Sequence, residues 1–508
     1  MQILTAGQAA EKIKDGSTIG VAGMGLAGWP EEVGRAIAAN YRETGHPCGL
    51  NLKQGCSLGD WKTRGTTVLG VPGLVAKWSG AHIGSSFALN ELVLAGKIEC
   101  HCLPQGVIIN LWREIAAGRP GLVTKVGLGT FVDPRVQGGK MNDATKTELV
   151  ELIEFGGDEY LFYKSFPLDV ALLRGTIADE KGNISFENEG MINEGLAVAQ
   201  AAKNSGGIVI VQVEHIAEAG TLKPKDVRIP GIFVDYVVRA TYDEASWQTE
   251  GSRFKPAFSG QIKEPVSNIE ALALDERKLI ARRCAMEIEK GSVVNLGIGI
   301  PTYVSKVLAE EGRLDEITMT AESGAVGGVL VPLPDFGVAY NPEALITHGE
   351  MFDFIDGGGL DLSCLGMGEV DVCGNVNVSK FNNRLFGPGG FIDITRSTKT
   401  ILFCGTFMNK AKLDISDKGL TILEEGDITK FVSAVEQITF CGAEAGPGQR
   451  VLYITERCVF QLTDGKMVLT EIAPGVDLKN DILDKMDFMP VILAEGPGLM
   501  ASAIFAGF

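Results

Sequence analysis

Histidine is scarce in this chain, and its scarcity limits the chemistry that the sequence can support. The 508 residues include only five histidines: His46, His82, His101, His215 and His348. They lie far apart in the sequence and form no recognisable Ser/His/Asp or Cys/His arrangement. A nucleophile that depends on a neighbouring histidine base is therefore not expected.

Long apolar runs and net positive charge are also lacking. No run approaches the roughly 18 apolar residues that a membrane-spanning helix needs. Residues 1–6 lack the basic and apolar regions of a secretory signal. The formal net charge of -18 argues against a general binder of nucleic acid or of anionic membranes. We therefore expect a cytoplasmic protein that binds neither nucleic acid nor membrane.

The ten cysteines do not indicate a disulfide framework, because the chain is long and shows no secretory signal. The only tight cluster is Cys100, His101 and Cys102. No second pair of Cys or His lies nearby at ligand spacing, so alternate positions on a half-buried strand explain the cluster better than a zinc site does. We predict reduced thiols and no metal.

What the chain does have is length and glycine. At 508 residues it exceeds the ~250–300 residues at which one hydrophobic core usually stops growing, which predicts two or more domains. The 65 glycines are nearly twice the typical share of about 7%. Many turns and close approaches of the backbone follow from that count.

Two stretches of the sequence repeat one pattern. Residues 16–30 read GSTIGVAGMGLAGWP and residues 291–301 read GSVVNLGIGIP, and apolar residues at helical spacing follow both. Each is typical of a strand, a glycine loop and a helix that begins near a proline. A second pair keeps the same order, with ADEKGNI at 178–184 and VDVCGNV at 370–376. We predict an α/β fold of two tandem, related, open domains with mainly parallel sheets.

The domain boundary is predicted in the polar stretch from about Gln248 to Asn268, which contains proline and glycine. This gives an N-terminal domain at 1–260, enlarged by insertions, and a C-terminal domain at 270–508. Near the end of the chain, residues 451–455 and 458–463 are typical of strands, and residues 467–470 follow Asp464 and Gly465. We interpret these as a hairpin on the second sheet.

Glu322 is the strongest candidate for chemistry. Residues 318–328 read TMTAESGAVGG, so one carboxylate lies between a β-prone run and a glycine-rich stretch. A glutamate is already ionised at neutral pH and needs no base to act as a nucleophile. The small residues that follow leave room for a large electrophile. Taken alone, the segment fits a solvated acid at a strand end better than it fits a nucleophile. The choice between these two roles therefore depends on the rest of the sequence.

A glycine loop precedes Glu322 by about twenty residues. The loop presents backbone N–H groups at a helix start, where they can hold a phosphate or an oxyanion; its residues are Gly297, Ile298, Gly299, Ile300 and Pro301. The proline and the missing acidic ribose contact argue against a nicotinamide or flavin site. In a βαβ unit the loop and the end of the next strand meet at one sheet edge, so the loop and Glu322 are predicted to lie together.

Asn375 is a candidate amide donor to an oxyanion, although a simple turn asparagine explains it better when it is considered alone. Two further glycine loops lie at 357–359 and 387–390. The simplest interpretation is that their glycines form ordinary turns. Lys380, Arg384, Arg396 and Lys399 form a locally basic stretch. A solvated face explains that stretch better than a phosphate site does.

With these motifs in view, the sequence resembles the family I CoA-transferases, most closely the single-chain acetate and propionate CoA-transferases with fused halves. The resemblance runs through nearly the whole chain. It includes LPQG at 103–106, GLGTFVDPR at 127–135, GGKMN at 138–142 and LRGT at 173–176 in the first half. In the second half it includes 295–301, 322–328, 352–361, 374–381, 387–391 and 454–460.

The resemblance implies a ping-pong transfer of CoA between short carboxylic acids, with a glutamyl-CoA thioester on Glu322. It implies that the loop at 297–301 contacts CoA, that an N–H of that loop and the Asn375 amide form the oxyanion hole, and that Gly389 and Gly390 line the CoA thiol arm. CoA is then a substrate, and no cofactor is needed. The resemblance also suggests a homo-oligomer, often a tetramer.

The acid substrates stay open at this point. Acids that differ by one methylene differ by only about 1–3 kcal/mol in an apolar pocket, and no residue here separates acetate from propionate. Acetoacetate, as used by the 3-oxoacid CoA-transferases, is the nearest alternative. A non-catalytic regulator that binds CoA or a sugar phosphate is the alternative from another class, but no DNA-binding helix-turn-helix is recognisable.

Overall fold

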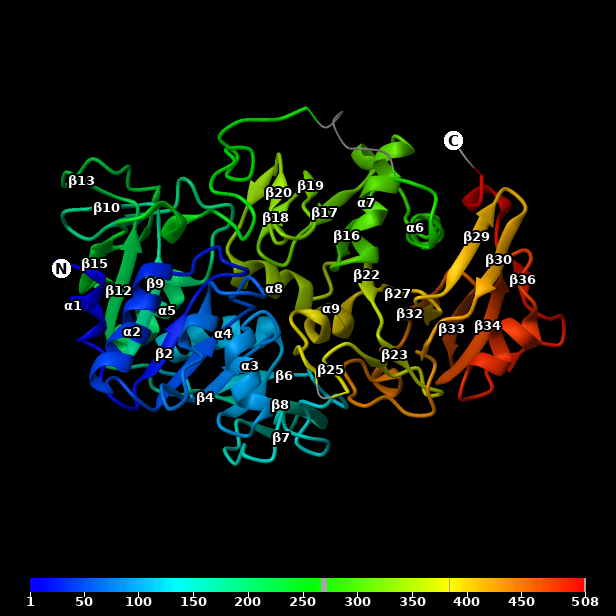
Figure 1. The fold of residues 1–508 in the computed structure, drawn as a ribbon, viewed down its shortest axis with the longest axis horizontal. Helices are drawn as coiled ribbons and strands as arrows, with labels where there is room; N and C mark the ends of the chain where they lie inside the picture. The colour runs from blue at the N-terminus through cyan, green and yellow to red at the C-terminus, as the bar shows by residue number, and fades with distance from the viewer. Residues whose placement is uncertain (266–271, 383, 507–508) are drawn as a thin grey trace.

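The computed structural model describes residues 1–508 apart from 266–271, 383 and 507–508. It has two α/β halves that lie side by side, with the N-terminus on one flank and the last strands on the other (Figure 1). Each half is built on its own sheet. Among the described helices, none is both long enough and apolar enough to cross a membrane.

The first half is built on an eight-stranded, wholly parallel sheet in the order β1-β15-β12-β9-β2-β3-β4-β5. Its central strands are buried along nearly their whole length, as expected for parallel strands covered on both faces. The strands are β1 (Gln2–Leu4), β2 (Thr18–Val21), β3 (Leu50–Gln54), β4 (Val75–Gly80), β5 (Glu99–Cys102), β9 (Val170–Arg174), β12 (Ile208–Val213) and β15 (Tyr236–Arg239). The helices are α1 (Ala6–Ala10), α2 (Glu31–Thr44), α3 (Phe87–Leu94), α4 (Gln105–Ala116) and α5 (Gly195–Asn204).

The second half has a mixed sheet whose middle is parallel, in the order β21-β18-β17-β16-β22-β27-β32-β33-β34-β35, with β36 also paired to β34. The strands are β16 (Val293–Leu296), β17 (Thr318–Thr320), β18 (Ala325–Val326), β21 (Ala344–Leu345), β22 (Leu362–Gly366), β27 (Thr400–Cys404), β32 (Arg450–Ile454), β33 (Cys458–Thr463), β34 (Lys466–Ile472), β35 (Val491–Ile492) and β36 (Gly498–Leu499). The helices are α6 (Glu276–Ala285), α7 (Ile300–Glu310), α8 (His348–Asp356) and α9 (Phe391–Ser397).

The two sheets share one strand order, which confirms the predicted tandem α/β fold. The run β15-β12-β9-β2-β3 in the first half corresponds to β32-β27-β22-β16-β17 in the second. In both, the strand before the repeated glycine loop lies beside the strand that follows the helix. Beyond this shared core, the first half continues with parallel β4 and β5, and the second half with antiparallel β18 and β21.

The smaller elements follow the sequence patterns. An antiparallel sheet of β6 (Gly121–Thr124), β8 (Asp158–Lys164) and β7 (Val150–Phe155) forms an insertion in the first half. The C-terminal hairpin is confirmed as β33 and β34, which Asp464 and Gly465 join. Cys100, His101 and Cys102 lie on a strand, β5, as predicted, but all three are buried, so the expected half-buried alternation is absent there. The two sheets come from residues on either side of the predicted boundary, but the boundary itself stays a prediction, and its residues 266–271 lie outside the described part.

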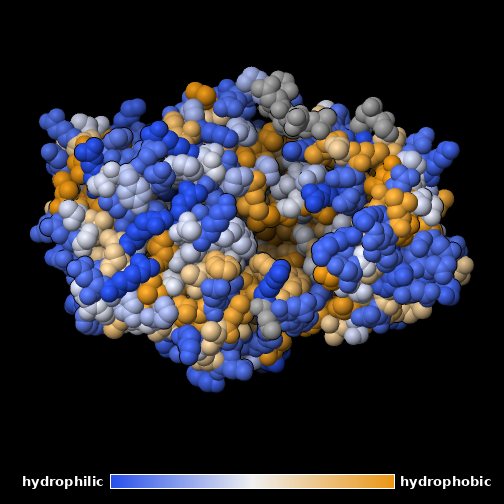
Figure 2. All heavy atoms as spheres, viewed as in Figure 1, coloured by the Kyte–Doolittle hydropathy of each residue, from blue (hydrophilic) through white to orange (hydrophobic). Residues whose placement is uncertain are grey.

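The halves meet through α4 of the first half, which packs against α8 and α9 of the second. Arg113 of α4 pairs with Asp353 of α8 at 2.7 Å, and Asn110 donates to the same carboxylate. A small apolar cluster also forms from both halves, with Met24, Cys56 and Met191 against Val331 and Val338. Figure 2 shows apolar atoms around a recess between the halves. The candidate site lies at this junction.

Candidate active site

Glu322 lies in the tight turn that joins β17 to the antiparallel strand β18. The N–H of Ala321 donates to the carbonyl of Ala325, and Gly324 donates back to Ala321. Gly324 has φ of +107°, and a side-chain carbon there would lie 2.1 Å from the carbonyl oxygen of Ile346. Gly324 is therefore required by the turn and by the neighbouring backbone, and not only by the size of a substrate.

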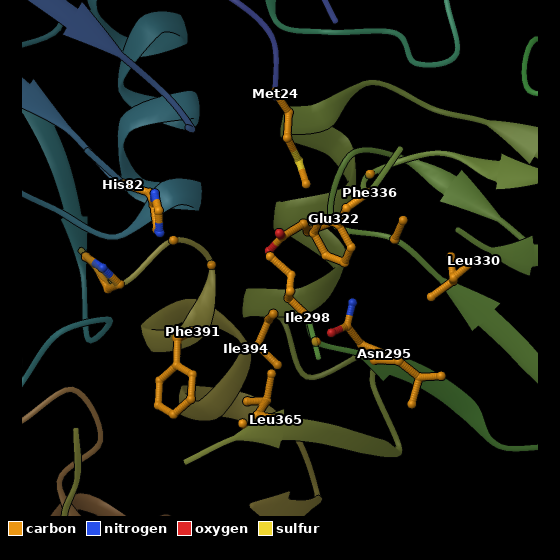
Figure 3. Close-up of a pocket in the computed structure, with 18 of the residues that line it drawn as sticks. Met24, His82, Asn295, Ile298, Glu322, Leu330, Phe336, Leu365, Phe391 and Ile394 are labelled. Carbon is orange, nitrogen blue, oxygen red and sulfur yellow. The ribbon is translucent and has the colours of Figure 1, made fainter. Parts of the chain in front are cut away.

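The predicted meeting of the glycine loop and Glu322 is present in the structure. Strands β16 and β17 are parallel neighbours, with Asn295 opposite Thr320, so the residues after them share one sheet edge. Gly297 and Ile298 line a cavity of about 250 Å³ together with Glu322, and we call this the loop chamber. The Glu322 carboxylate projects into it beside Ile298 (Figure 3).

The five loop residues do not all line the loop chamber. Gly299 and Ile300 border a separate cavity of about 480 Å³, on whose walls Arg277, Tyr303 and Lys410 also lie. Pro301 is buried in the first turn of α7. The loop at 297–300 thus lies between the two cavities.

Gly389 and Gly390 form the facing wall of the loop chamber. A methyl group added at Gly390 would lie 2.1 Å from Oε2 of Glu322, so this glycine is in direct contact with the carboxylate. Within the described residues, the backbone N–H groups of Ile298 and Gly390 have no hydrogen-bond partner. Both are available to an oxygen that carries negative charge near Glu322.

Glu322 is less acidic than an ordinary glutamate. Burial raises its pKa to about 7, and the charge on His348 opposes that rise. Near neutral pH the side chain is therefore divided between its carboxylate and carboxylic acid forms. A poorly solvated carboxylate of this kind is a stronger nucleophile than one in water.

A second chamber of about 240 Å³ opens on the other side of Glu322, between the halves, and we call it the interface chamber. Both chambers are lined by Met24, His82, Ile298, Phe336 and Gly389 as well as by Glu322. The interface chamber is mostly apolar; its further lining includes Leu26, Trp61, Met191, Leu333 and Pro334. Glu322 thus stands where two cavities of different composition join.

Sequence reasoning missed three buried polar residues near Glu322. Gln105, the first residue of α4, lines the interface chamber. Its side-chain nitrogen lies 3.0 Å from Nε2 of His348, and Nδ1 of His348 lies 2.9 Å from Oε2 of Glu194. The LPQG motif contained Gln105, but no sequence signal linked it to a histidine 243 positions away.

Asn375, the predicted oxyanion donor, makes local contacts in the structure, and its role in the reaction stays a prediction. Its amide nitrogen donates to Oδ2 of Asp371 at 3.0 Å, and its Oδ1 accepts the N–H of Gly442 at 2.9 Å. Asn375 lines neither the loop chamber nor the interface chamber. One N–H of its amide thus serves a turn, in which the Asp-x-x-Gly-Asn sequence folds back on its own aspartate.

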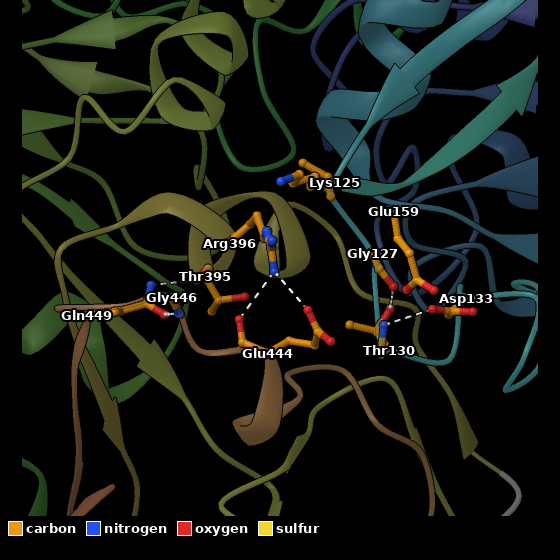
Figure 4. Close-up of polar contacts among 12 residues, drawn as sticks. Lys125, Gly127, Thr130, Asp133, Glu159, Thr395, Arg396, Glu444, Gly446 and Gln449 are labelled. Atoms are coloured by element: carbon orange, nitrogen blue, oxygen red, sulfur yellow. Dashed lines mark hydrogen bonds and ion pairs between the residues drawn. The ribbon is translucent and has the colours of Figure 1, made fainter. Parts of the chain in front are cut away.

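The basic stretch is largely taken up by ion pairs. Lys380 lies 3.9 Å from Glu436, and Lys399 lies 2.7 Å from Asp361. Arg396 bonds both the carbonyl and the carboxylate of Glu444, as Figure 4 shows. Arg384 is exposed on a short strand pair. This arrangement fits the solvated-face interpretation better than a phosphate site.

Comparison with known proteins identifies the family. The model of the coenzyme A transferase family matches residues 3–240. The chain is 63% identical over 500 residues to the caffeate CoA-transferase of Acetobacterium woodii, covering 97% of this chain and 95% of that protein. It is 43% identical over 499 residues to the acetate CoA-transferase YdiF of Escherichia coli K12, covering 97% and 93%.

The fold agrees with these matches. A crystal structure of the acyl-CoA transferase YdiF from Escherichia coli O157:H7, as a thioester complex with CoA, superposes with a TM-score of 0.92 at 41% identity. The match covers 99% of this chain and 96% of that one. With the shared strand order and a glutamate that lies between glycine loops, these matches show that the chain belongs to the coenzyme A transferase family, as a single-chain family I CoA-transferase.

Proposed function

We propose that this CoA-transferase moves CoA from an acyl-CoA to a second carboxylic acid through covalent intermediates on Glu322. The observation that carries the proposal is the place of the Glu322 carboxylate, at the junction of two chambers and beside the N–H groups of Ile298 and Gly390. The crystal structure of YdiF as a thioester complex with CoA supports a covalent route in a similar protein.

The proposed reaction proceeds by two acyl transfers that are then reversed. The Glu322 carboxylate attacks the thioester carbonyl of the acyl-CoA, and CoA leaves as its thiolate to give a mixed anhydride. The thiolate attacks the glutamyl carbonyl, which releases the first acid and leaves a glutamyl-CoA thioester. The incoming carboxylate attacks that thioester, and the same steps run backwards. One thioester replaces another, so the proposal requires neither ATP nor a cofactor.

The site has to stabilise an oxyanion in each step and keep water from the intermediates. We assign the oxyanion donors to the backbone N–H groups of Ile298 and Gly390, in place of the Asn375 amide. Gly389 and Gly390 then line the path of the thiol arm through the loop chamber. The apolar walls of both chambers limit the access of water.

The cavity beyond the loop is suited to the nucleotide end of CoA. Gly299 and Ile300 at the start of α7 border it. Arg277 and Lys410 lie on its walls together with Glu276 and Glu456, and Lys410 pairs with Asp427 at 3.0 Å. Helix starts and basic side chains together favour phosphate groups. We propose that Arg277→Ala and Lys410→Ala raise the KM for acyl-CoA with little change in kcat. A lowered kcat with unchanged KM in both variants would contradict this assignment.

The interface chamber is proposed to hold the acid. Its apolar walls and its place between the halves suit an acid larger than acetate, and the most similar relative reported above is named for caffeate. We propose that a hydrophobic, aryl-bearing acid is the preferred substrate. Acetate and propionate, the acids expected from the sequence, would leave much of the chamber empty.

The test is a matrix of donors and acceptors. Acetyl-, propionyl-, acetoacetyl- and caffeoyl-CoA are each incubated with each of the corresponding acids, and the products are separated by chromatography. The proposal expects transfer by the wild-type protein, none by Glu322→Gln, and the highest kcat/KM with the caffeoyl pair. Equal transfer by Glu322→Gln would overturn the mechanism, and a preference for the acetyl pair would overturn the acid assignment.

A further inference from the structure

Asp15, His46 and Cys48 form a cluster of metal-ligating side chains at the surface of the first half. Their ligand atoms all lie within 4.8 Å of one another. Asp15 lies in the connection from α1 to β2, whereas His46 and Cys48 lie in the connection from α2 to β3. Because Asp15 and His46 are 31 positions apart, the sequence shows no motif at metal-ligand spacing, and no metal was expected from it.

The donor atoms lie near the spacing of a tetrahedral zinc site. Nδ1 of His46 lies 2.8 Å from Oδ2 of Asp15 and 3.0 Å from Oδ1. Bonds of about 2.0 Å to nitrogen and oxygen and about 2.3 Å to sulfur place tetrahedral donors roughly 3.3–3.5 Å apart. Small shifts of these side chains therefore bring all three donors onto one ion.

Hydrogen bonds hold the backbone that carries the three side chains. The N–H of Cys48 donates to Oδ1 of Asp15 at 2.8 Å, and the N–H of Gly16 donates to the carbonyl of Cys48 at 2.8 Å. Thr44, the last residue of α2, donates through its hydroxyl to the carbonyl of His46 at 3.1 Å. The two connections are thus joined without an ion, and the Asp15 carboxylate is oriented by a hydrogen bond, as metal-ligating carboxylates commonly are.

The donor types limit the ion that the cluster suits. A thiolate, an imidazole and a carboxylate suit zinc and similar divalent ions, whereas calcium and magnesium take oxygen ligands. The side chains of His46 and Asp15 are 68% and 46% exposed. Three protein ligands at an exposed place leave a fourth position to water, so we expect an exchangeable ion.

We propose that Asp15, His46 and Cys48 bind one divalent cation of the zinc class, which clamps the connection before β2 to the connection before β3. On binding, the Cys48 thiol gives its proton to water, and the sulfur binds the ion as a thiolate. The ion takes the bare Nδ1 of His46, which leaves the ring hydrogen on Nε2 whichever nitrogen carried it before. Asp15 supplies a carboxylate oxygen.

The proposed metal site is separate from the chambers around Glu322. Asp15 and Cys48 precede β2 and β3, whereas Met24 and Cys56, which line the interface chamber, follow these strands. Because β2 and β3 are parallel neighbours, their starts share one edge of the sheet and their ends share the other. The proposal is therefore independent of the function proposed for Glu322, and its expected effect is on the stability of the first half.

The experiment titrates Co²⁺ into the reduced, full-length protein after treatment with a chelator. Co²⁺ replaces zinc in such sites, and a Co²⁺–thiolate bond gives a charge-transfer band in the near ultraviolet. We expect one Co²⁺ per chain with this band, no band in Cys48→Ser, and binding weaker by about tenfold or more in Asp15→Asn and His46→Gln. One equivalent of Zn²⁺ should displace the Co²⁺. Cys373→Ser is the control and should keep the band, because Cys373 is an exposed cysteine outside the cluster.

Thermal unfolding with and without Zn²⁺ provides the second measurement. An ion that binds the folded chain should raise the unfolding temperature of the wild type and of Cys373→Ser, but not that of Cys48→Ser. If the wild type gives no thiolate band, or if the band persists in Cys48→Ser, the proposal fails. If Asp15→Asn and His46→Gln bind Co²⁺ as tightly as the wild type, the ion is adventitious and the proposal also fails. An unfolding temperature that Zn²⁺ leaves unchanged in the wild type would rule out the clamp.

Discussion

As the proposed nucleophile, Glu322 has to meet two opposed requirements. It has to be ionised to attack a thioester, and it has to be shielded from water so that the anhydride and the thioester survive. Burial raises its pKa to about 7, so shielding reduces the ionised fraction near neutral pH. The influence of His348 opposes the effect of burial on this pKa.

The raised pKa of Glu322 predicts a rate that increases with pH. The carboxylate is the reactive form, so activity is gained as the pH rises through about 7. We expect the rate of adduct formation to increase about tenfold between pH 6 and pH 8 and then to level off. Single-turnover rates with one acyl-CoA at several pH values test this, and a rate that is flat from pH 5 to pH 8 would contradict it.

Gly390 leaves no space for a side chain. A methyl group there would lie 2.1 Å from the Glu322 carboxylate, although φ at Gly390 is -81°, which any residue can adopt. We expect Gly390→Ala to fold and to lose about 100-fold or more in kcat, because the carboxylate is displaced. Gly446→Ala is the matched control, since nothing lies within 4 Å of the added methyl group. Equal kcat in the two variants would show that the contact is unimportant.

At the scale of elements, the two halves repeat one turn in detail. Asp179 accepts from the amide of Asn183 at 2.9 Å, and Asn183 accepts the N–H of Gly231 at 3.0 Å. Asp371, Asn375 and Gly442 make the same two bonds in the second half. The first half has this turn without a nucleophile like Glu322, so the turn serves the fold rather than the chemistry.

The repeated turn predicts the same effect for two substitutions. Asn375→Ala and Asn183→Ala each remove two hydrogen bonds, which contribute about 1 kcal/mol each to stability. We expect each variant to unfold at a temperature lower by roughly 2–8 °C. We also expect each to transfer CoA at nearly the wild-type rate. A large loss of kcat in Asn375→Ala with none in Asn183→Ala would show that the Asn375 amide acts as an oxyanion donor.

The sequence predicts features that depend on local residue patterns, and it does not predict contacts that depend on how the two halves pack. The strand, loop and helix around Gly297 follow from local patterns, and the parallel pairing of β16 with β17 brings the loop to Glu322. Those parts of the fold and site were predictable. The role of the Asn375 amide could not be decided from the sequence, because a turn and an oxyanion donor need the same residue type.

The contacts of Gln105 with His348 were not predictable, because they depend on how two complete domains pack. The same holds for the interface chamber, whose walls come from segments as distant as Met24 and Phe336. Local periodicity carries no information about such pairs.

At the scale of the whole molecule, the halves together build the interface chamber, which we propose holds the acid. Phe336 from the second half and Trp61 from the first lie on its walls. Neither half alone encloses it. Under the proposed function, acid selectivity is therefore a property of the junction, whereas the proposed nucleophile belongs to one half.

The junction predicts a change in acid preference when its wall is cut back. We expect Phe336→Ala to raise the KM for caffeate by about tenfold or more through lost apolar contact, and to change the KM for acetate much less. Phe155→Ala is the control, because this residue is 73% exposed on the small insertion sheet. Steady-state rates with both acids provide the comparison. If Phe336→Ala changed the KM for caffeate and the KM for acetate equally, caffeate would not bind against Phe336 in the interface chamber.

The most direct test of the account is the mass of the protein after incubation with an acyl-CoA and no acceptor acid. The account predicts an added mass of one CoA less one water on the wild-type chain, removed by hydroxylamine and absent from Glu322→Ala. An adduct of the same yield on Glu322→Ala, or no adduct on a wild-type protein that does transfer CoA from that donor, would contradict it.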